Sequence, residues 1–171
     1  MTGVCLRTLD ETWLGRLIHT ATRHATPSET MPMRKTQEWD PQVTAAFHDY
    51  HRKRSMQPAL HSYIIAIDTT VLGAVRLDDI GHLEHGTFET DMWLARNARG
   101  KYLASQALRL ALARADDLGA RNVIAHTSFD NLAAHAAMRR IGAYLKLEET
   151  GIRAEFVLAE CLGSAAVPQL T

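Results

Sequence analysis

Apolar positions recur along this chain with two spacings, and each change of spacing marks the boundary of a predicted element. A two-residue alternation is typical of a half-buried strand, whereas apolar positions three and four residues apart indicate an amphipathic helix. Proline at the first turn of a helix and glycine just past its end mark further boundaries. In the first third of the chain, these patterns predict a strand over 4–9, a helix over 10–24, a loop over 26–40 and a helix over 41–54.

The rest of the chain predicts several strands interrupted by two helices. Two short apolar runs on either side of Asp68–Thr70 are expected to pair as a hairpin. The predicted elements are strands at 63–67, 71–77 and 87–94, a helix at 105–118, a strand at 122–127, a helix at 131–141, and strands at 144–149 and 153–159. This order predicts an α/β domain in which a mixed sheet carries helices on both faces.

Composition limits the function classes. A length of 171 residues suits one domain, which we assign to residues 1–160, with 161–171 as a C-terminal tail. Nineteen basic and nineteen acidic side chains give a formal net charge of +0, so we expect neither nucleic acid nor an anionic membrane surface as a partner. The two cysteines, Cys5 and Cys161, are far apart in sequence, and no apolar stretch approaches the ~20 residues of a membrane span. We therefore expect a cytoplasmic protein.

A short turn before the helix at 105–118 is the strongest candidate for a ligand site. It reads Arg99-Gly100-Lys101-Tyr102-Leu103-Ala104 and follows a predicted strand. Such a turn directs several backbone N–H groups, and the positive end of the helix dipole, at one spot, which favours a phosphate. The alternative is a plain loop-to-helix junction with a solvated Arg-Gly-Lys.

Two segments beside this turn carry a family resemblance. They are Glu89-Thr-Asp-Met-Trp-Leu94 before it and Asn131-Leu-Ala-Ala-His-Ala-Ala-Met-Arg-Arg-Ile-Gly142 after it. With the turn, they resemble the GNAT superfamily of acyl-CoA-dependent N-acyltransferases, whose turn reads Q/R-x-x-G-x-G/A, and most of all the branch that includes the ribosomal-protein N-terminal acetyltransferases. The resemblance implies the GNAT fold, with a mixed, mostly antiparallel sheet of about six to seven strands. It also implies acetyl-CoA as the acyl donor, without a metal.

The resemblance assigns coenzyme contacts residue by residue. The backbone of the turn would bind the pyrophosphate, strand amides would face the thioester oxygen, and Asn131 would hydrogen-bond the pantetheine arm. The assigned residues are Met92, Trp93, Leu94, Arg99, Gly100, Lys101, Tyr102, Leu103, Ala104, Ser105 and Asn131. Two positions depart from the family pattern. Tyr102 replaces the central glycine of the turn, and Met138 replaces a tyrosine that often protonates the departing thiolate; Tyr102 and Tyr144 are the alternatives for that acid.

Glu89 and Asp91 are the candidate catalytic residues. Because they alternate along the strand at 87–94, both should point to one face of the sheet, together with Trp93. A primary amine with a pKa near ~10 must lose a proton before it attacks a thioester. The resemblance gives Glu89 the role of general base, and we rank Asp91 second. The alternative is a charged pair at a sheet edge or one that orients the acceptor; His126 would either line the site or be structural.

Three other features bear on partners. Five carboxylates could gather near the site and favour a cationic acceptor: Asp78, Asp79, Glu84, Glu89 and Asp91. His82-Leu-Glu-His85 has the residue types of a zinc site, but its spacing and the absence of nearby cysteines favour a solvated connection. Four side chains of the early helical region would shape the acceptor site or, more commonly, pack in the core: Met31, Met33, Phe47 and Tyr50.

The sequence thus predicts an N-acetyltransferase that acts on a small-molecule or peptide amine, as a monomer or homodimer. Two alternatives remain open. One is an acyl-CoA-binding or regulatory module without turnover, suggested by the two departures. The other is an enzyme of the same fold that uses a different acyl or aminoacyl donor.

Overall fold

The computed structural model describes residues 3–32 and 35–163. Seven strands form one sheet in the order β1-β2-β3-β4-β5-β7-β6. Their bounds are β1 Cys5–Thr8, β2 Leu60–Ile67, β3 Thr70–Asp79, β4 Thr87–Leu94, β5 Asn122–Thr127, β6 Tyr144–Glu148 and β7 Gly151–Val157. Only β4 and β5 run parallel, whereas the other five neighbouring pairs are antiparallel. The mixed, mostly antiparallel sheet expected from the sequence is confirmed.

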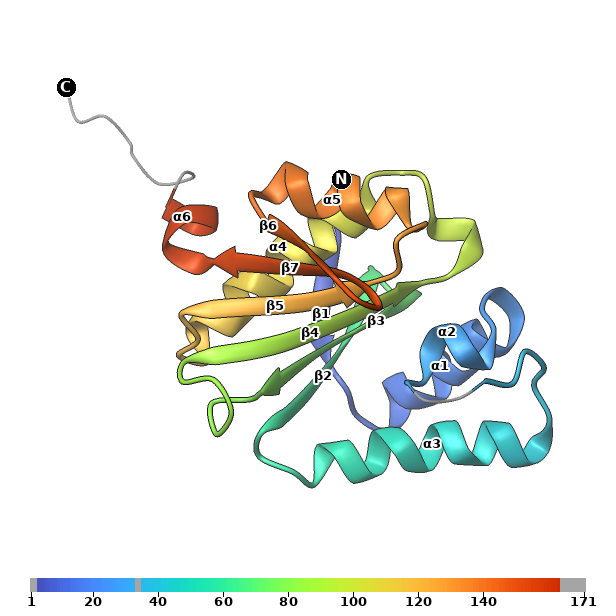
Figure 1. The fold of residues 1–171 in the computed structure, drawn as a ribbon. Helices are drawn as coiled ribbons and strands as arrows, with labels where there is room; N and C mark the ends of the chain where they lie inside the picture. Colours follow the sequence, from blue (N-terminus) through green and yellow to red (C-terminus); the bar gives the residue numbers. More distant parts are fainter. Residues whose placement is uncertain (1–2, 33–34, 164–171) are drawn as a thin grey trace.

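Helices cover both faces of this sheet (Figure 1). Their bounds are α1 Glu11–His24, α2 Pro27–Thr30, α3 Pro41–Ser55, α4 Leu103–Asp117, α5 Leu132–Ile141 and α6 Leu158–Gly163. One core lies between the sheet and α4 and α5, and includes Phe88, Leu112 and Phe156. The second core lies on the opposite face, where Leu17 of α1 and Phe47 of α3 pack with Trp93 of β4.

Local sequence signals explain most helix boundaries. Asp10 and Asp40 cap α1 and α3, since their Oδ1 atoms accept hydrogen bonds from the Trp13 and Val43 N–H groups at 2.8 and 2.7 Å. At the C-terminal end of α5, Gly142 takes a left-handed conformation with φ 103°. These caps lie where the sequence predicts them.

Among the strands, β2 begins three residues earlier than expected and β7 is shifted two residues toward the N-terminus. Three helices also differ from the sequence prediction. The loop expected over 26–40 contains α2, which a capping box between Thr26 and Glu29 stabilises. Helix α4 begins at Leu103, two residues earlier than expected. Residues 161–163 are not tail, because they belong to α6 and Cys161 is buried against the core. The rest of the expected tail, 164–171, and the candidate acceptor residue Met33 lie outside the described residues.

A buried histidine sits on the inner face of α3. His51 is 1% exposed and neither ring nitrogen has a hydrogen-bond partner in the described structure. Its ring packs edge-on against Phe47 and Tyr50. Burial, reinforced by the positive charges of Arg54 and Arg76, lowers the pKa of His51 to about 3. The folded chain therefore holds this ring neutral at pH 5.

We predict that His51 makes folding sensitive to mild acid. The unfolded ring protonates near pH 6.5 whereas the folded ring stays neutral, so the unfolded state binds more protons as the pH falls. This difference should cost about 2 kcal/mol of unfolding free energy between pH 7 and pH 5. In His51→Leu that loss should disappear from urea titrations at the two pH values. His82 is exposed, so the control variant His82→Gln should lose as much stability as wild type between pH 7 and pH 5. If His51→Leu also loses as much stability as wild type, this account is contradicted.

Candidate functional site

Strands β4 and β5 separate shortly after they pair. Their ladder has three rungs, Thr87 with Asn122, Phe88 with Val123 and Glu89 with Ile124. Beyond Glu89, β4 continues to pair with β3 on one side, and β5 continues to pair with β7. The edges that face each other across the gap therefore keep backbone N–H and C=O groups without a strand partner. Glu89 stands at the apex of this gap.

A groove of about 320 Å³ follows the gap and runs between α4 and α5. Strands β4 and β5 form its floor, the turn before α4 forms one end, and small side chains of α5 form a wall. The lining residues that the sequence predicts as coenzyme contacts or catalytic are Asp91, Met92, Leu94, Arg99, Gly100, Tyr102, Leu103, Ala104 and Asn131. The turn and the two segments that carry the family resemblance thus meet at one groove.

The turn presents free backbone donors to this groove. Gly100 and Tyr102 both adopt left-handed conformations, with φ 74° and φ 58°. No side chain caps the N-terminus of α4. The N–H groups of the first turn of a helix have no acceptor within the helix. At α4, the N-cap side chain does not supply one either. This arrangement suits an anionic group at the helix N-terminus.

Four predicted contact residues direct their side chains elsewhere. Trp93 is buried in the core on the opposite face of the sheet, as its alternation with Met92 and Leu94 requires. Ser105 is buried at 7% exposure. Lys101 donates from Nζ to the Asn97 carbonyl at 3.1 Å. Arg99 lines the groove, but its guanidinium is held by other groups. The side chains of Trp93, Lys101 and Arg99 are therefore packed or hydrogen-bonded within the protein itself.

Arg99 connects the turn to α2. Its Nε donates to the Leu94 carbonyl at 3.0 Å, and its Nη2 donates to Glu29 Oε1 at 2.8 Å. Burial alone would raise the pKa of Glu29, but hydrogen bonds from the Thr26 N–H and from Arg99 lower it. One side chain thus joins the end of β4, the turn and α2.

The structure ranks the two tyrosines considered as an acid. Tyr102 lines the groove, and the Arg140 guanidinium lies 4.6 Å from its ring centroid. Tyr144 is not among the lining residues, and its hydroxyl donates to Glu160 at 2.7 Å. That hydrogen bond raises the pKa of Tyr144. Met138, at the position of the family tyrosine, is a buried lining residue.

Asn131 has a structural role at the start of α5. Its Oδ1 accepts a hydrogen bond from the Ala134 N–H at 3.1 Å and caps α5. Because Asn131 also lines the groove, its amide NH₂ group is left for other contacts.

The two candidate catalytic carboxylates have different partners. Glu89 Oε1 lies 3.1 Å from His126 Nδ1, and both side chains are 45% exposed. Asp91 accepts a hydrogen bond from Arg76 at 2.6 Å and its side chain is 52% exposed. Asp91 and His126 line the groove, whereas Glu89 adjoins it through His126.

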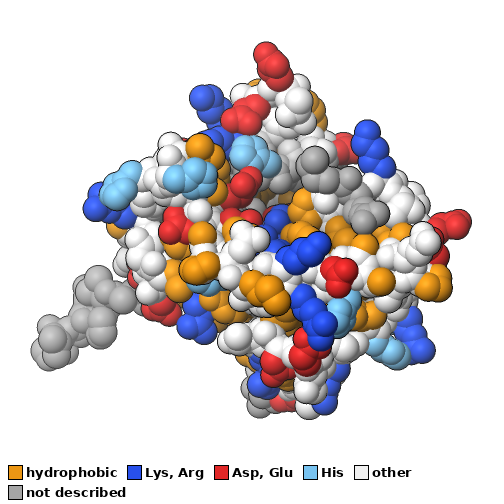
Figure 2. All heavy atoms as spheres, turned by 90° about the horizontal axis from the view of Figure 1, so that it is seen from below, with side chains coloured by type: hydrophobic (Ala, Val, Ile, Leu, Met, Phe, Trp, Pro, Cys, Tyr) orange, Lys and Arg blue, Asp and Glu red, His pale blue; other side chains and the backbone are white. Residues whose placement is uncertain are grey.

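Of the five carboxylates that the sequence suggests could gather near the site, the first three along the chain are held by other groups of the protein. Asp78 pairs with Arg54 and Arg76, Glu84 pairs with Arg153, and Asp79 accepts from the Gly81 N–H. Basic partners that are far away in sequence, and therefore invisible to local patterns, compensate Asp78 and Glu84. In Figure 2, Lys and Arg side chains likewise lie among Asp and Glu side chains across the face that is seen from below. Only Glu89 and Asp91 are both close to the groove and half exposed.

Some lining residues escaped the sequence analysis. They are Thr90, Leu108, Ala125, Thr127, Ala133, Ala134 and Ala137. Met138 and His126 also line the groove, although the sequence did not assign either to the coenzyme site. A run of small residues in α5 was the available signal, since alanine lets a helix approach a ligand closely. Met31 and Phe47 are core residues, whereas Tyr50 is half buried with a hydroxyl that has no partner in the described structure.

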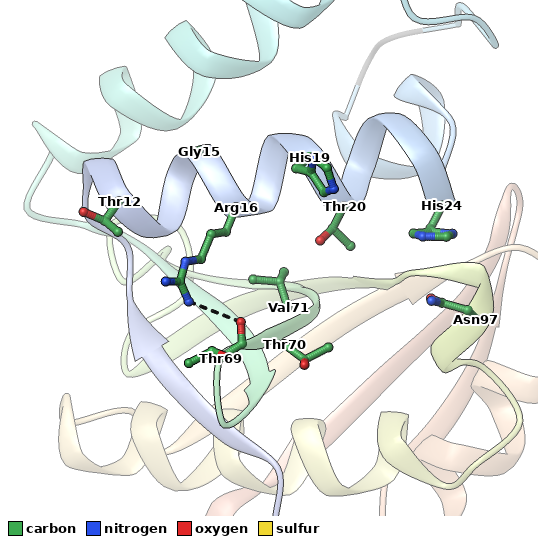
Figure 3. A pocket seen from close by; sticks show the side chains of 10 residues that line it. All are labelled: Thr12, Gly15, Arg16, His19, Thr20, His24, Thr69, Thr70, Val71 and Asn97. Carbon is green, nitrogen blue, oxygen red and sulfur yellow. Dashed lines mark hydrogen bonds between the residues drawn. The ribbon is translucent and has the colours of Figure 1, made fainter.

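A hollow of about 690 Å³, separate from the groove, lies between α1 and the β2–β3 turn (Figure 3). Arg16 closes one end by donating to the Thr69 carbonyl at 3.3 Å, and the side chains of His24 and Asn97 lie at the other. Its wall includes neither Glu89 nor the turn before α4. Within residues 3–32 and 35–163, no group of three or more His, Cys, Asp or Glu could hold a metal ion, and no helix is long and apolar enough to cross a membrane.

Comparison with known proteins agrees with this geometry. A family model described as "Acetyltransferase (GNAT) family" matches residues 23–143. No curated protein sequence matches the chain. Among solved structures, RimL, a ribosomal L7/L12 alpha-N-protein acetyltransferase in complex with coenzyme A, superposes with TM-score 0.74 at 16% identity over 92% of this chain and 95% of that chain. Spermidine N-acetyltransferase from Vibrio cholerae, in complex with CoA and spermine, gives 0.73 at 14% identity over 93% and 98%.

We predict that the turn before α4 carries strain at Tyr102. A non-glycine residue at φ 58° pays roughly 1–2 kcal/mol that glycine avoids. Tyr102→Gly and Tyr102→Ala both remove the ring and its contact with Arg140, but only glycine relieves the backbone. We expect Tyr102→Gly to be the more stable of the two by about 1 kcal/mol in urea unfolding. Equal stability, or a more stable alanine variant, would show that residue 102 is not left-handed in solution.

Proposed function

Because the chain belongs to the GNAT acetyltransferase family, we propose that this N-acetyltransferase moves acetyl from acetyl-CoA to a primary amine by direct nucleophilic attack. The observation that carries the proposal is the meeting of three features at one groove. They are the divergence of β4 and β5, the uncapped N-terminus of α4, and the carboxylate of Glu89 at the apex of the divergence.

The chain's own groups fit an acyl-CoA. The uncapped N–H groups of α4 and the left-handed turn at Gly100 would hold the pyrophosphate. The free edge of β4 near Met92 and Leu94 would hydrogen-bond the pantetheine arm and the thioester oxygen, as an added strand would. Asn131 would contribute its amide from the other wall. Bound acetyl-CoA supplies an activated thioester carbonyl to this site.

Glu89 is the proposed general base. It removes a proton from the ammonium form of the acceptor, directly or through water, so that the neutral amine can form the C–N bond. Attack breaks the C–S bond, and the departing thiolate takes up a proton. Asp91, which accepts a hydrogen bond from Arg76 at 2.6 Å, would orient the acceptor. Tyr102 is the groove tyrosine available as an acid, and a thiol with a pKa near ~8.5 leaves without strong assistance.

The acceptor is proposed as a small-molecule or peptide amine. The similar structures include enzymes named for spermidine and for a ribosomal protein, which support an amine without choosing between these classes. Because Asp78, Glu84 and Asp91 are paired with arginine, Glu89 is the carboxylate beside the groove that has no arginine partner among the described residues, and it would attract a cationic acceptor. The cytoplasm is the proposed compartment, and a monomer or homodimer stays our prediction; a similar spermidine N-acetyltransferase is dodecameric.

Coenzyme binding is predicted to depend on Gly100. A valine at φ 74° must shift the turn, although no atom lies within 4 Å of the added Cβ. Misaligned amides should weaken CoA binding at least about tenfold in titration calorimetry, because each charge-assisted hydrogen bond contributes roughly 1.5–3 kcal/mol. Gly119→Val is the matched control, since Gly119 follows α4 with φ 92° and equally open surroundings. Equal CoA affinity in both variants would remove the turn from the coenzyme site.

Turnover is predicted to depend on Glu89 more than on Asp91. Glu89→Gln keeps the shape but loses the base, so kcat should fall by about 10²–10⁴-fold with CoA affinity unchanged. Asp91→Asn should act mainly by raising KM for the acceptor. Thiol release with a panel of polyamines and N-terminal peptides measures both. Wild-type kcat in Glu89→Gln would overturn its role, and binding of acetyl-CoA without acylation of any amine would favour a binding module.

A further inference from the structure

Three ionisable side chains form a row across the sheet beside the groove. Glu89 of β4 lies 3.1 Å from His126 Nδ1 of β5. On the other side of the same ring, His126 Nε2 lies 3.5 Å from Glu148 Oε2 of β6. Glu89 has no other hydrogen-bond or ion-pair partner among the residues that the structure describes. The imidazole therefore connects the proposed base to a second carboxylate through its two different nitrogens.

A close approach of backbones makes this row possible. Strand β7 lies between β5 and β6, so Glu148 must reach His126 past the start of β7. The residue paired with Glu148 is Gly151. A Cβ at Gly151 would lie 2.4 Å from the Thr127 carbonyl oxygen. The absence of a side chain there lets the β6–β7 hairpin approach β5, which brings Glu148 within reach of the ring.

His126 also lies in the wall between two cavities. It lines the groove of about 320 Å³, and it lines a second cavity of about 260 Å³ with Thr127, Ser128, Glu148, Thr150, Gly151 and Ile152. Glu89 lies at Nδ1 of the ring, whereas Glu148 lies at Nε2 and lines the second cavity. The side chain of Glu148 is 36% exposed, so its carboxylate can exchange protons with water.

We propose that Glu89, His126 and Glu148 form a proton relay that carries the acceptor's proton out of the site through the second cavity. This inference rests on the proposed amine acetylation. Its starting state has neutral His126 with the hydrogen on Nε2. Protonated Glu89 gives its proton to Nδ1, the Nε2 proton passes to Glu148, and Glu148 releases it to water. Glu89 is then again a carboxylate, and return of the ring to its first tautomer completes the cycle. Glu89 is the catalytic residue, while His126 and Glu148 are positioning residues that act through it.

Other charged groups around the ring set its electrostatic environment. Arg153 of β7 is the register partner of His126, and Lys146 of β6 is the register partner of Arg153. Arg153 is itself paired with Glu84 at 3.2 Å. Glu89 and Glu148 are the charged groups within 3.5 Å of the ring nitrogens, and Arg153 and Lys146 hold the adjacent register positions. A bound cationic acceptor would add to them, so pH profiles must be taken at saturating acceptor.

The test compares His126→Ala, His126→Gln, Glu148→Gln and the control Glu149→Gln in the full chain. Glu149 is the exposed neighbour of Glu148 at the hairpin turn. For the two His126 variants and Glu148→Gln we expect kcat to fall at least about tenfold, with KM for acetyl-CoA unchanged and an altered pH profile of kcat. In a Glu89→Gln background, His126→Gln should cost nothing more, because the two residues serve one proton path.

Chemical rescue distinguishes a relay from a structural role. His126→Ala leaves a space beside a 260 Å³ cavity, where free imidazole can take the place of the ring. We expect added imidazole to restore kcat of His126→Ala in a saturable manner, but to leave Glu89→Gln and wild type unchanged. Absence of rescue, or full additivity with Glu89→Gln, would overturn the relay.

The outcomes separate the two levels of inference. If wild type acetylates an amine and the His126 and Glu148 variants retain its kcat and pH profile, only the relay is wrong. If wild type binds acetyl-CoA but acylates no amine, the proposed function is wrong and the relay falls with it. Should His126→Ala fail to fold in circular dichroism, Glu148→Gln, which alters a half-exposed side chain, still decides the question.

Discussion

The divergence of β4 and β5 is the constraint on which the site depends. Three rungs of parallel ladder join the strands, and beyond Glu89 each strand keeps only its outer neighbour. Unpaired peptide groups inside a fold are costly unless water or a ligand satisfies them. An extended polar chain that enters the gap can pair with these groups as a strand would. The same divergence leaves the Glu89 side chain 45% exposed beside the open edges of the two strands.

Sequence patterns anticipated this framework because its signals are local. The strand over 87–94, the turn at Arg99–Ala104 and the caps of α1, α3 and α5 each depend on residues close together in the chain. The resemblance that located the groove is likewise carried by contiguous segments. Short elements such as α2 and α6 were missed, because a capping box and burial of Cys161 stabilise them rather than a periodic pattern.

What the sequence could not supply is the direction and partnership of polar side chains. The pairing of Arg99 with Glu29 spans 70 positions, and that of Arg153 with Glu84 spans 69. Such contacts neutralise carboxylates that look like an acidic cluster in the sequence. Asp91, which lines the groove, and Glu89, which adjoins it, both stay about half exposed. The alternation of residues over 87–94 predicts that Glu89 and Asp91 share a strand. Only the fold shows that Glu89 contacts His126 and that Asp91 contacts Arg76.

The three-rung ladder also has a consequence for folding. It divides the sheet into an antiparallel β1–β4 part, in which consecutive strands are neighbours, and an antiparallel β5–β7 part, in which β7 lies between β5 and β6. Joining the parts requires closure of the crossover through α4, which connects the only parallel pair of neighbouring strands in the described sheet. Parallel pairing of this kind gains its contacts only after the loop-closure entropy has been paid. The groove, which is made of both parts, therefore comes into existence when they dock, so that assembly of the site and completion of the fold are a single event.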